Sequence, residues 1–456
     1  GWCRLVQCRL RYHQRYHQRC HPRFIRKISR RPDPVGSVRE ITTCFMKKIA
    51  FIIIRYGVEV NGGAEVHCRM LAERLRPYYD VEVLTTTTRI FRDPASDYPE
   101  GVSTVNGVTV RRFKPAPIDG EHHGLYRKKC KTARRIRLQL AKMGLLGVIS
   151  SLHPEWTMSL EAEKRYYESQ EDHTPQMLEF IERHKDEYAA FLFMNFYFSQ
   201  PVLGSTIAPE KTILIPLVHP DKPLYYSINA PMFTRVRHIA FNTAAERQLC
   251  RRAFGASLAP NSLVGCGIEE APEADWGGVK AKYGLPDQYV LYLGRITPSK
   301  TTRVIPDFLR YKKEHGGEIK LVMVGGTELD IERSDSPDII FTGYVSDEEK
   351  SAIIRHATVM VNPSRMESLS LLMLEAMQNR VPLLVNGRSR VMKDHCKSSG
   401  AAFWYDSSRD FRNKLHRLIS DPELRRTMSE KGPAYVREHY DWSVIIPKLR
   451  TLIESL

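Results

Sequence analysis

Two glutamates, Glu367 and Glu375, combine a residue type and a spacing that suit the chemistry of a polar ligand. They lie in the segment 362–377, NPSRMESLSLLMLEAM, where a Pro-Ser turn precedes apolar residues that recur at three-residue intervals. This spacing predicts a helix after the turn, with Glu367 in the loop before it and Glu375 one to two turns inside it. A carboxylate in that position can accept two hydrogen bonds from the vicinal hydroxyls of a ribose.

The start of the same helix is a candidate phosphate site. We expect Ser368, Leu369 and Ser370 to present backbone N–H groups there, and a helix N-terminus favours anions. A nucleotide with its pyrophosphate at the helix start and its ribose against Glu375 would satisfy both features. The residues alone leave a second interpretation open, in which two solvated surface carboxylates share this spacing by chance.

Two cations follow the predicted strand QYVLYL, which ends at Gly294 and Arg295, with Lys300 five residues further on. A forked guanidinium and a compact ammonium both suit the oxygens of a diphosphate whose charge grows as it leaves. Gly325, at the end of the next predicted strand, joins the candidate nucleotide-binding residues. Basic loops without a function are the alternative.

The first half of the chain contributes three further candidates. Gly62 and Gly63 lie between a predicted strand over 47–55 and a predicted helix, where glycines let a phosphate or sugar approach the backbone amides. His219 ends a strand predicted over 212–219, and the carboxyl ends of parallel strands form the ligand crevice of α/β sheets. A simple turn and a structural histidine are the corresponding alternatives.

Apolar strands alternate with helices in two successive halves, which predicts an α/β protein with two doubly wound, Rossmann-like domains facing across a cleft. The predicted organisation is a basic extension without a fold over 1–45, a first domain over 46–268, a linker over 269–286 and a second domain over 287–438, followed by residues 439–456 as a C-terminal helix. No apolar run has the eighteen residues of a membrane span.

The net charge of +17 is unevenly distributed, because residues 1–45 contain eleven Lys or Arg and only two acidic residues. This distribution weakens the prediction of a nucleic-acid partner. The same segment has four of the nine cysteines and the near-repeat RYHQ-RYHQ-RCHP. A zinc site and a mitochondrial presequence are alternatives to an unfolded extension. The five remaining cysteines are scattered and odd in number, so we expect reduced thiols in a cytoplasmic protein.

A basic stretch at 127–142 is the candidate contact with an anionic membrane. Its cations are Arg127, Lys128, Lys129, Lys131, Arg134, Arg135, Arg137 and Lys142. Leucines and isoleucines between them give the segment an apolar side, as in helices that lie at an interface. An acidic acceptor and a plain solvated face are the alternatives.

The paired glutamates, with Pro-Ser before them and Glu-Ala-Met after, resemble the motif of retaining glycosyltransferases of the GT-B class, family 4 type (glycosyl transferases group 1). In that family the second Glu, here Glu375, holds the donor ribose, and the first, here Glu367, lies near the donor sugar. The resemblance also implies that His219 contacts the donor sugar, that Arg295 and Lys300 hold the diphosphate, and that Tyr344 and Val345 seat the base. It extends over 46–456 and implies that the last helix crosses back to the first domain.

Four positions depart from the family pattern. Ser368 and Leu369 stand where the family usually has Phe-Gly, and Thr301 and Arg380 each replace a Gly. The resemblance nonetheless implies a metal-independent transferase that moves a sugar, with retention, from a UDP- or GDP-type donor to a glycan or lipid-linked acceptor. The implied setting is bacterial-type polysaccharide, lipopolysaccharide or glycolipid synthesis, in the cytoplasm or at the inner face of the membrane.

Two other functions stay open on the sequence. One is a sugar-nucleotide epimerase or phosphorylase of the same fold. The other is a basic nucleic-acid or membrane-binding module that keeps the fold without the chemistry.

Overall fold

The computed structural model describes residues 46–456, except 271, 298–300, 302 and 327–335, together with two short strands nearer the start of the chain. Those strands, β1 (Ile28–Ser29) and β2 (Ile41–Thr42), pair antiparallel within a first unit formed by residues 1–47. Residues 48–456 form the second unit, which contains two lobes.

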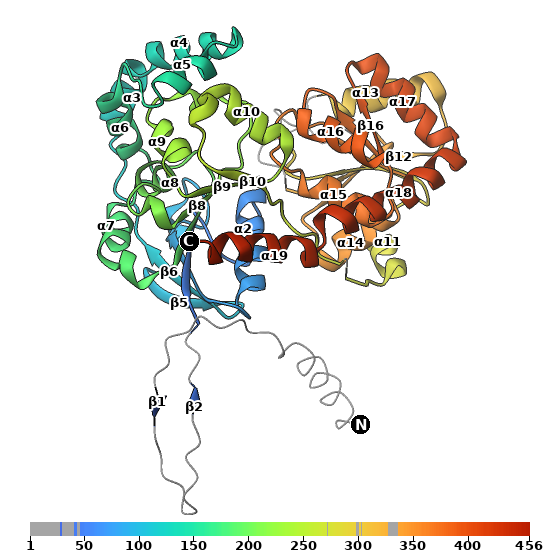
Figure 1. The fold of residues 1–456 in the computed structure, drawn as a ribbon. Helices are drawn as coiled ribbons and strands as arrows, with labels where there is room; N and C mark the ends of the chain where they lie inside the picture. The colour runs from blue at the N-terminus through green and yellow to red at the C-terminus, as the bar shows by residue number, and fades with distance from the viewer. Residues whose placement is uncertain are drawn as a thin grey trace, which may run out of the picture. The chain divides into compact units, whose positions relative to one another are not determined.

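The first lobe contains an eight-stranded sheet in the order β10-β9-β8-β7-β3-β4-β6-β5 (Figure 1). Its strands are β3 (Lys48–Ile52), β4 (Asp80–Thr86), β5 (Gly101–Val105), β6 (Val108–Phe113), β7 (Ala190–Met194), β8 (Thr212–Ile215), β9 (His238–Phe241) and β10 (Asn261–Leu263). Neighbours run parallel except β5 and β6, a hairpin whose turn residues Asn106 and Gly107 both have positive φ. Two positive-φ residues are what a tight two-residue hairpin turn requires.

The second lobe contains a six-stranded, fully parallel sheet in the order β13-β12-β11-β14-β15-β16. Its strands are β11 (Tyr289–Leu293), β12 (Lys320–Val324), β13 (Ile339–Gly343), β14 (Val359–Asn362), β15 (Leu383–Asn386) and β16 (Ala402–Tyr405). In both sheets the strand order reverses beside the first strand, between β3 and β7 and between β11 and β14. Ligands of doubly wound sheets bind at this reversal. The predicted fold class, two doubly wound α/β domains, is confirmed.

Helices connect the strands and cover both faces of the two sheets. The first lobe has α2 (Gly63–Leu75), α3 (Gly120–Lys129), α4 (Lys131–Lys142), α5 (Leu146–Leu152), α6 (Leu160–Glu168), α7 (Pro175–His184), α8 (Ser199–Gly204), α9 (Asn229–Thr234) and α10 (Ala244–Phe254). The second has α11 (Trp276–Tyr283), α13 (Val304–His315), α14 (Asp347–Arg355), α15 (Leu371–Gln378), α16 (Arg390–Ser399), α17 (Ser408–Ser420) and α18 (Pro422–Tyr440), and α19 (Trp442–Glu454) ends the chain. Short 3-10 turns are η1 (Pro94–Ser96), η2 (Lys185–Glu187), η3 (Pro209–Lys211), η4 (Lys222–Tyr225) and η5 (Gly255–Ser257).

Several of these helices begin where the sequence supplies a side-chain cap. Ser346 and Glu349 form a reciprocal capping box at the start of α14. Thr243, Ser389 and Ser407 accept backbone N–H groups at the starts of α10, α16 and α17. Each such cap contributes about 1 kcal/mol to helix stability.

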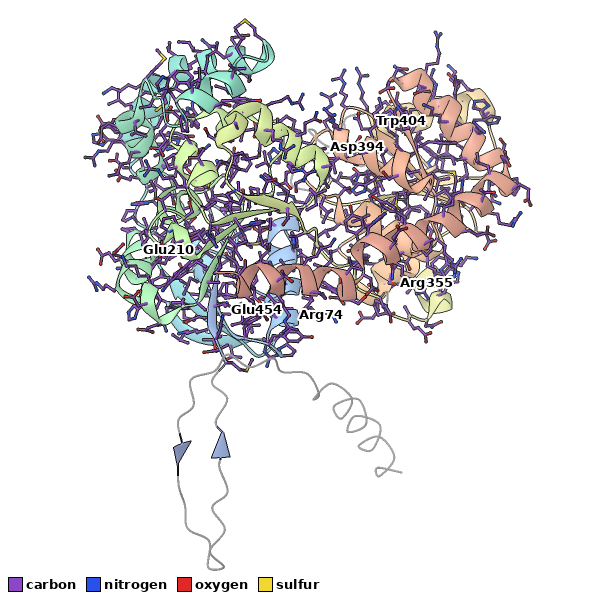
Figure 2. The ribbon with its side chains drawn as sticks, viewed as in Figure 1. Arg74, Glu210, Arg355, Asp394, Trp404 and Glu454 are labelled. Atoms are coloured by element: carbon purple, nitrogen blue, oxygen red, sulfur yellow. The ribbon has the colours of Figure 1, made fainter. Side chains whose placement is uncertain are left out.

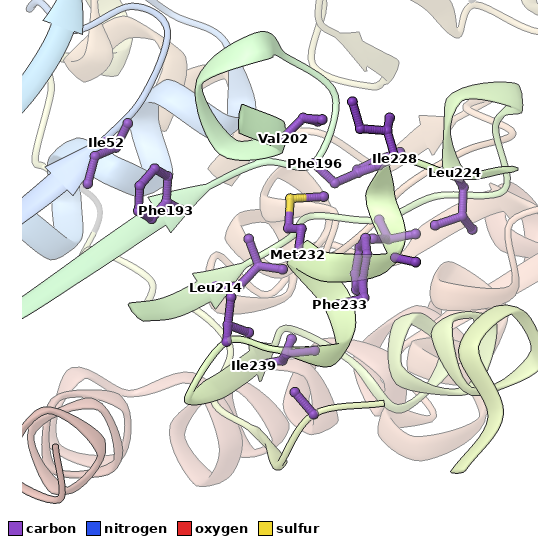
Figure 3. Packing of buried hydrophobic residues seen from close by; sticks show 14 of the residues in the cluster. Ile52, Phe193, Phe196, Val202, Leu214, Leu224, Ile228, Met232, Phe233 and Ile239 are labelled. Carbon is purple, nitrogen blue, oxygen red and sulfur yellow. The ribbon is translucent and has the colours of Figure 1, made fainter. Parts of the chain in front are cut away.

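The core of the first lobe consists of strands that are buried on both faces, as parallel sheets require. Figure 3 shows Ile52, Phe193, Leu214 and Ile239, one from each of four adjacent strands, packed with Met232 and its neighbours from α9. Each of these side chains is almost completely buried. Burying a side chain of this size contributes about 1.5–3 kcal/mol.

The last helix, α19, packs on the first lobe. Its Ile445, Leu449 and Ile453 belong to the same buried cluster as Ile49 and Phe51 of β3. The guanidinium of Arg74 in α2 lies 5.1 Å from the ring centroid of Trp442, at the start of α19, and Figure 2 labels Arg74 beside this helix. The polypeptide therefore passes from the first lobe to the second and then returns.

The structure differs from two sequence expectations. The segment predicted as a linker, 269–286, contains helix α11, because Val279 and Leu285 are buried in the core of the second lobe. The strand predicted over 212–219 ends at Ile215, since Pro216 has no N–H for the ladder and Leu217 has a φ of +53°. His219 consequently lies four residues beyond the strand rather than at its end.

The cations of the basic stretch 127–142 differ in their burial. Arg137 of α4 is 1 % exposed. Its guanidinium lies 4.6 Å from the ring centroid of Trp156, and burial lowers its pKa to about 10. The nearby carboxylate of Glu163 partly offsets that cost by raising the pKa.

Candidate functional site

The carboxyl edge of the second sheet is built from glycines in conformations that other residues rarely adopt. Gly294, Gly325 and Gly343 follow or end β11, β12 and β13, with φ of +135°, +132° and +72°. The Gly294 amide donates to the carbonyl of Val324, and the Gly325 amide donates to the carbonyl of Gly343, at 3.0 and 2.9 Å. A Cβ atom on Gly325 would collide with the Gly294 carbonyl oxygen. Only glycine therefore permits this close spacing of backbones.

Arg295 directly follows this glycine edge. The Tyr292 hydroxyl donates to the Arg295 carbonyl at 2.7 Å, and burial raises the pKa of Tyr292. The charge of Arg295 opposes that rise in pKa, whereas the charge of Glu367 adds to it. Arg295 and Glu367, predicted from separate motifs, thus both lie close to one hydroxyl group. Lys300, the second predicted cation, lies outside the described residues.

The loop before α15 has the polarity expected of an anion site. Ser370, at the N-cap, has a φ of +68°, and its hydroxyl accepts from the side-chain amide of Asn362 at 3.2 Å. Within the described part of the chain, the amides of Ser368, Leu369 and Ser370 donate to no acceptor. The start of α15 therefore retains N–H groups that could bind an anion.

The carbonyl groups of this loop are held by residues that the sequence analysis did not identify. Thr243 of the first lobe donates its hydroxyl to the Ser368 carbonyl at 3.2 Å. His395 of α16 lies with Nε2 2.9 Å from the Leu369 carbonyl and Nδ1 2.9 Å from the Tyr435 hydroxyl. Burial lowers the pKa of His395 to about 4, so the ring is neutral at pH 7. A neutral ring satisfies both contacts by donating through Nε2 and accepting at Nδ1.

Glu375 is the fifth residue of α15 and has an incompletely satisfied carboxylate. Its side chain is 25 % exposed overall, but Oε2 is buried and accepts no hydrogen bond from a described residue. The Lys350 ammonium lies 3.4 Å from this oxygen and 3.4 Å from Asp347. Burial raises the pKa of Glu375, and Lys350 opposes that rise. A buried carboxylate oxygen whose only described partner is one ammonium group at 3.4 Å can accept further hydrogen bonds from ligand hydroxyl groups.

Tyr344 and Val345 follow β13 at the same edge of the sheet. Tyr344 is 76 % exposed, and its ring covers Gly326, where a Cβ atom would collide with it. Val345 packs against the core of the second lobe. An exposed aromatic ring on a fixed backbone can stack on a nucleobase.

Gly62 and Gly63 occupy different environments at the start of α2. Gly62 is the N-cap residue, and the carboxylate of Glu65 fills the space where its Cβ atom would lie. Arg55 donates to Glu65 through Nε and Nη2 at 3.0 and 2.6 Å. Gly63 has no atom within 4 Å of the corresponding position. The open approach predicted for both glycines is therefore present at Gly63, whereas at Gly62 the protein's own carboxylate takes that place.

His219 lies in the loop after β8, with its ring 5.9 Å from that of Phe196. Its Nδ1 is buried and has no hydrogen-bond partner among the described residues. Burial lowers the pKa of His219, so the neutral form predominates at pH 7. A neutral imidazole with one buried, unsatisfied nitrogen can bind a ligand hydroxyl.

Glu246 of α10 fixes the loop that carries His219, and the sequence analysis did not identify it. Oε1 accepts the amide of Val218 and Oε2 accepts the amide of Asn242, each at 2.6 Å. The side chain is 1 % exposed, and burial raises its pKa to about 8. The carboxyl group therefore joins the segments that follow β8 and β9.

One pocket of about 80 Å³ has residues of both lobes in its lining. The first lobe contributes Val218, Pro220, Ala245, Glu246, Leu249 and Arg252, and the second contributes Arg365, Met366, Glu367, Arg388, Ser389, Arg390 and Val391. Val218 and Pro220 flank His219 in the sequence. The pocket therefore places Glu367 and the loop of His219 on a common space.

Two absences hold for the described part of the chain. No group of three or more His, Cys, Asp or Glu side chains is arranged to hold a metal ion. No helix there combines the length and the apolar character needed to cross a bilayer.

Comparison with known proteins agrees with this architecture. Residues 280–435 match the family model described as glycosyl transferases group 1. Alpha-D-kanosaminyltransferase of Streptomyces kanamyceticus is 29 % identical over 182 residues, 38 % of this chain and 47 % of that protein. D-inositol 3-phosphate glycosyltransferase of Kineococcus radiotolerans is 25 % identical over 420 residues, 81 % of this chain and 85 % of that protein. The chain spans only about half the length of the first curated relatives that it matches.

Solved structures match over a larger share of the chain. Sucrose-phosphate synthase from Thermosynechococcus elongatus has a TM-score of 0.63 at 17 % identity, covering 90 % of this chain and 98 % of the other. HepE of Anabaena, in complex with UDP and glucose, has a TM-score of 0.63 at 13 % identity, covering 90 % and 100 %. The two doubly wound lobes thus have the GT-B fold, and residues 280–435 of the second lobe are similar to the glycosyl transferases group 1 family.

Proposed function

We propose that this protein is a retaining glycosyltransferase that moves a sugar from a nucleoside diphosphate to an acceptor hydroxyl group. The observation that carries the proposal is the buried Oε2 of Glu375, for which the described residues supply only the Lys350 ammonium, 3.4 Å away. This oxygen lies on α15, the helix whose start also leaves amides available. A ribose hydroxyl would donate a hydrogen bond to the Glu375 carboxylate, and a diphosphate at the start of α15 would accept hydrogen bonds from the amides.

The proposed chemistry depends on stabilising the charge of the leaving group. As the glycosidic bond opens, negative charge grows on the diphosphate, and the amides of 368–370 together with Arg295 would bind it more strongly. We assign Lys300 to the same role from the sequence. Glu367, which like Arg295 lies close to the Tyr292 hydroxyl, would orient the donor sugar. The neutral ring of His219 would hydrogen-bond a hydroxyl of that sugar.

Among donors, we favour a UDP-sugar. Solved structures of HepE contain UDP, or UDP-glucose, and HepE resembles this chain in fold. The exposed ring of Tyr344 offers a surface on which a planar base could stack. We propose a metal-independent reaction, which is what the resemblance to the family implies.

We also propose a glycan or lipid-linked acceptor and a place of action on the cytoplasmic side of a membrane. One relative is named as a capsular polysaccharide biosynthesis glycosyltransferase and another as a sulfoquinovosyl transferase. Helices α4 and α5 and the turn between them expose apolar side chains close to the cations of 127–142. These side chains are Ile136, Met143, Leu145 and Val148. Such a surface could lie on anionic lipid.

The central assignment can be tested with Glu375→Ala and Glu375→Gln in the full chain. We expect both variants to lose at least tenfold in UDP affinity, measured by calorimetry, because the ribose loses its ionised acceptor. Asp347→Asn is the matched control, since Asp347 contacts the same Lys350 but is largely exposed. Unchanged UDP binding and turnover in Glu375→Ala would refute the assignment.

A further inference from the structure

The pocket between Glu246 and Glu367 has an unusual excess of positive charge. Four arginines line it: Arg252, Arg365, Arg388 and Arg390. They come from three separate segments, namely α10, the loop after β14 and the start of α16. Their convergence is therefore a property of the fold, because no local sequence pattern brings these segments together.

None of these four guanidinium groups forms an ion pair or a side-chain hydrogen bond with a described residue. Most other arginines of the two lobes do have such partners, including several exposed ones such as Arg165 and Arg426. All four side chains are exposed, so solvent screens their mutual repulsion in part, and an anion in the pocket would reduce it further. The group is therefore distinguished by its convergence on one pocket and not by burial.

The pocket is separate from the site proposed for the donor diphosphate. Its lining includes neither Arg295 nor the loop 368–370, and Glu375 is also absent from it. It shares only Glu367 with the proposed donor site. Because Glu367 is assigned to the donor sugar, an anion in this pocket would lie on the sugar side of the donor rather than on its nucleotide side.

The chemistry of the lining favours a phosphate group. A planar guanidinium group donates two parallel hydrogen bonds to phosphate oxygens. Four guanidinium groups offer more N–H donors than the two oxygens of a carboxylate ligand can accept. Ser389 adds a hydroxyl group at the N-terminus of the ten-residue helix α16. This end of the helix dipole is positive, like the arginines, and therefore also favours an anion. The volume of about 80 Å³ exceeds that of two water molecules, which is enough for a compact oxyanion.

We infer that this pocket is a phosphate subsite, which binds the phosphoryl group of a phosphorylated acceptor or a free phosphate beside the donor sugar. The inference rests on the proposed function for its orientation, because Glu367 defines the sugar side. A bound phosphate ester would place the remainder of the acceptor between Glu367 and the loop of His219. The arginines would then select acceptors by their charge, and this selection is independent of how the nucleotide is held.

The test uses the full chain saturated with UDP, so that the donor site is occupied, and titrates inorganic phosphate by calorimetry. We expect binding that falls at least tenfold in the double variant Arg388→Gln/Arg390→Gln, while UDP affinity changes less than twofold. Arg355→Gln is the control, because Arg355 is exposed in α14 and lies outside the pocket lining (Figure 2). Failure of UDP to bind would instead refute the proposed function.

Two further ligands distinguish the source of the phosphate. Glucose 6-phosphate binding more tightly than inorganic phosphate, with glucose not binding, would support a phosphorylated acceptor. Inorganic phosphate binding more tightly than the ester would support a free phosphate as the occupant. Equal binding of phosphate by the wild type and the double variant, or acetate binding as tightly as phosphate, would overturn the inference.

Discussion

The carboxylates at the carboxyl edges of the two sheets differ in how fully the protein itself supplies their hydrogen-bond partners. In the first lobe, the carboxylates at this edge are satisfied from within: Glu65 by Arg55, and Glu246 by two backbone amides. In the second lobe, Oε2 of Glu375 has only the Lys350 ammonium, 3.4 Å away, and the amides of 368–370 have no hydrogen-bond partner among the described residues. Both edges lie at the reversal of a doubly wound sheet. In the first lobe, protein groups therefore satisfy the carboxylates, whereas the edge of the second lobe keeps hydrogen-bonding groups available for a ligand.

This contrast indicates a division of labour within one fold. Free polar groups cost stability, and a ligand that supplies their partners recovers that cost on binding. The first lobe instead uses its buried carboxylates to fix the loops that face the ligand. Changes at the two edges should therefore have different consequences for stability and for binding.

The largest effect is expected from Gly325→Ala at the edge of the second lobe. The new Cβ atom would collide with the Gly294 carbonyl, and the φ of +132° is unfavourable for alanine. We expect a loss of about 3 kcal/mol in the free energy of unfolding, measured by urea denaturation. Gly63→Ala is the matched control in the first lobe. With open space at its Cβ position, it should be neutral or stabilising by up to about 1 kcal/mol.

A second effect should depend on pH and should have opposite signs at the two edges. The pKa of Glu246 is raised from 4.5 to about 8, so its contribution to stability is complete below pH 4.5 and is lost as the pH rises towards 8. The pKa of His395 is lowered from 6.5 to about 4, so its contribution is complete above pH 6.5 and is lost as the pH falls towards 4.

The measurement is the free energy of unfolding against pH for Glu246→Gln and His395→Gln beside the wild type. Subtracting each variant from the wild type isolates one group from other titrating residues such as His67. The Glu246 difference should change between pH 4.5 and 8, and the His395 difference between pH 6.5 and 4. Difference curves with the same sign of slope would contradict the contrast between the two edges.

The smallest effect concerns the hydrogen bond that links the two edges. Thr243 caps α10 and donates to the Ser368 carbonyl of the second lobe. Thr243→Val removes both contacts and should cost about 1–2 kcal/mol, measured as a shift in the urea midpoint. Thr243→Ser keeps the hydroxyl group and should restore most of the loss. If serine and valine behave alike, the hydroxyl group is not what joins the lobes.

The sequence predicted those features that depend on neighbouring residues. The buried parallel strands were recognisable because they are continuous apolar runs, and the helix at 371–378 because its leucines and methionines recur regularly. Glu367 and Glu375 were recognisable because they belong to one short segment, in which they are eight positions apart. The helix at 276–283 was missed because its glycines and flanking acidic residues are typical of a linker.

Contacts between distant segments could not be predicted in this way. Glu246 acts on amides 28 and 4 residues away, and Thr243 reaches a carbonyl 125 residues away. The guanidinium of Arg137 packs on the ring of Trp156, which lies in the connection between α5 and α6. Each of these residues has an ordinary local sequence, and only the tertiary structure gives it a role.

The return of α19 to the first lobe has a consequence for how the protein matures. Ile445, Leu449 and Ile453 complete the apolar layer against β3, yet they are synthesised about four hundred residues after it. A nascent chain would therefore expose part of that layer until these later residues have left the ribosome. We expect the amino-terminal half, expressed alone, to associate through this uncovered surface, and a separate peptide of the last helix to suppress that association.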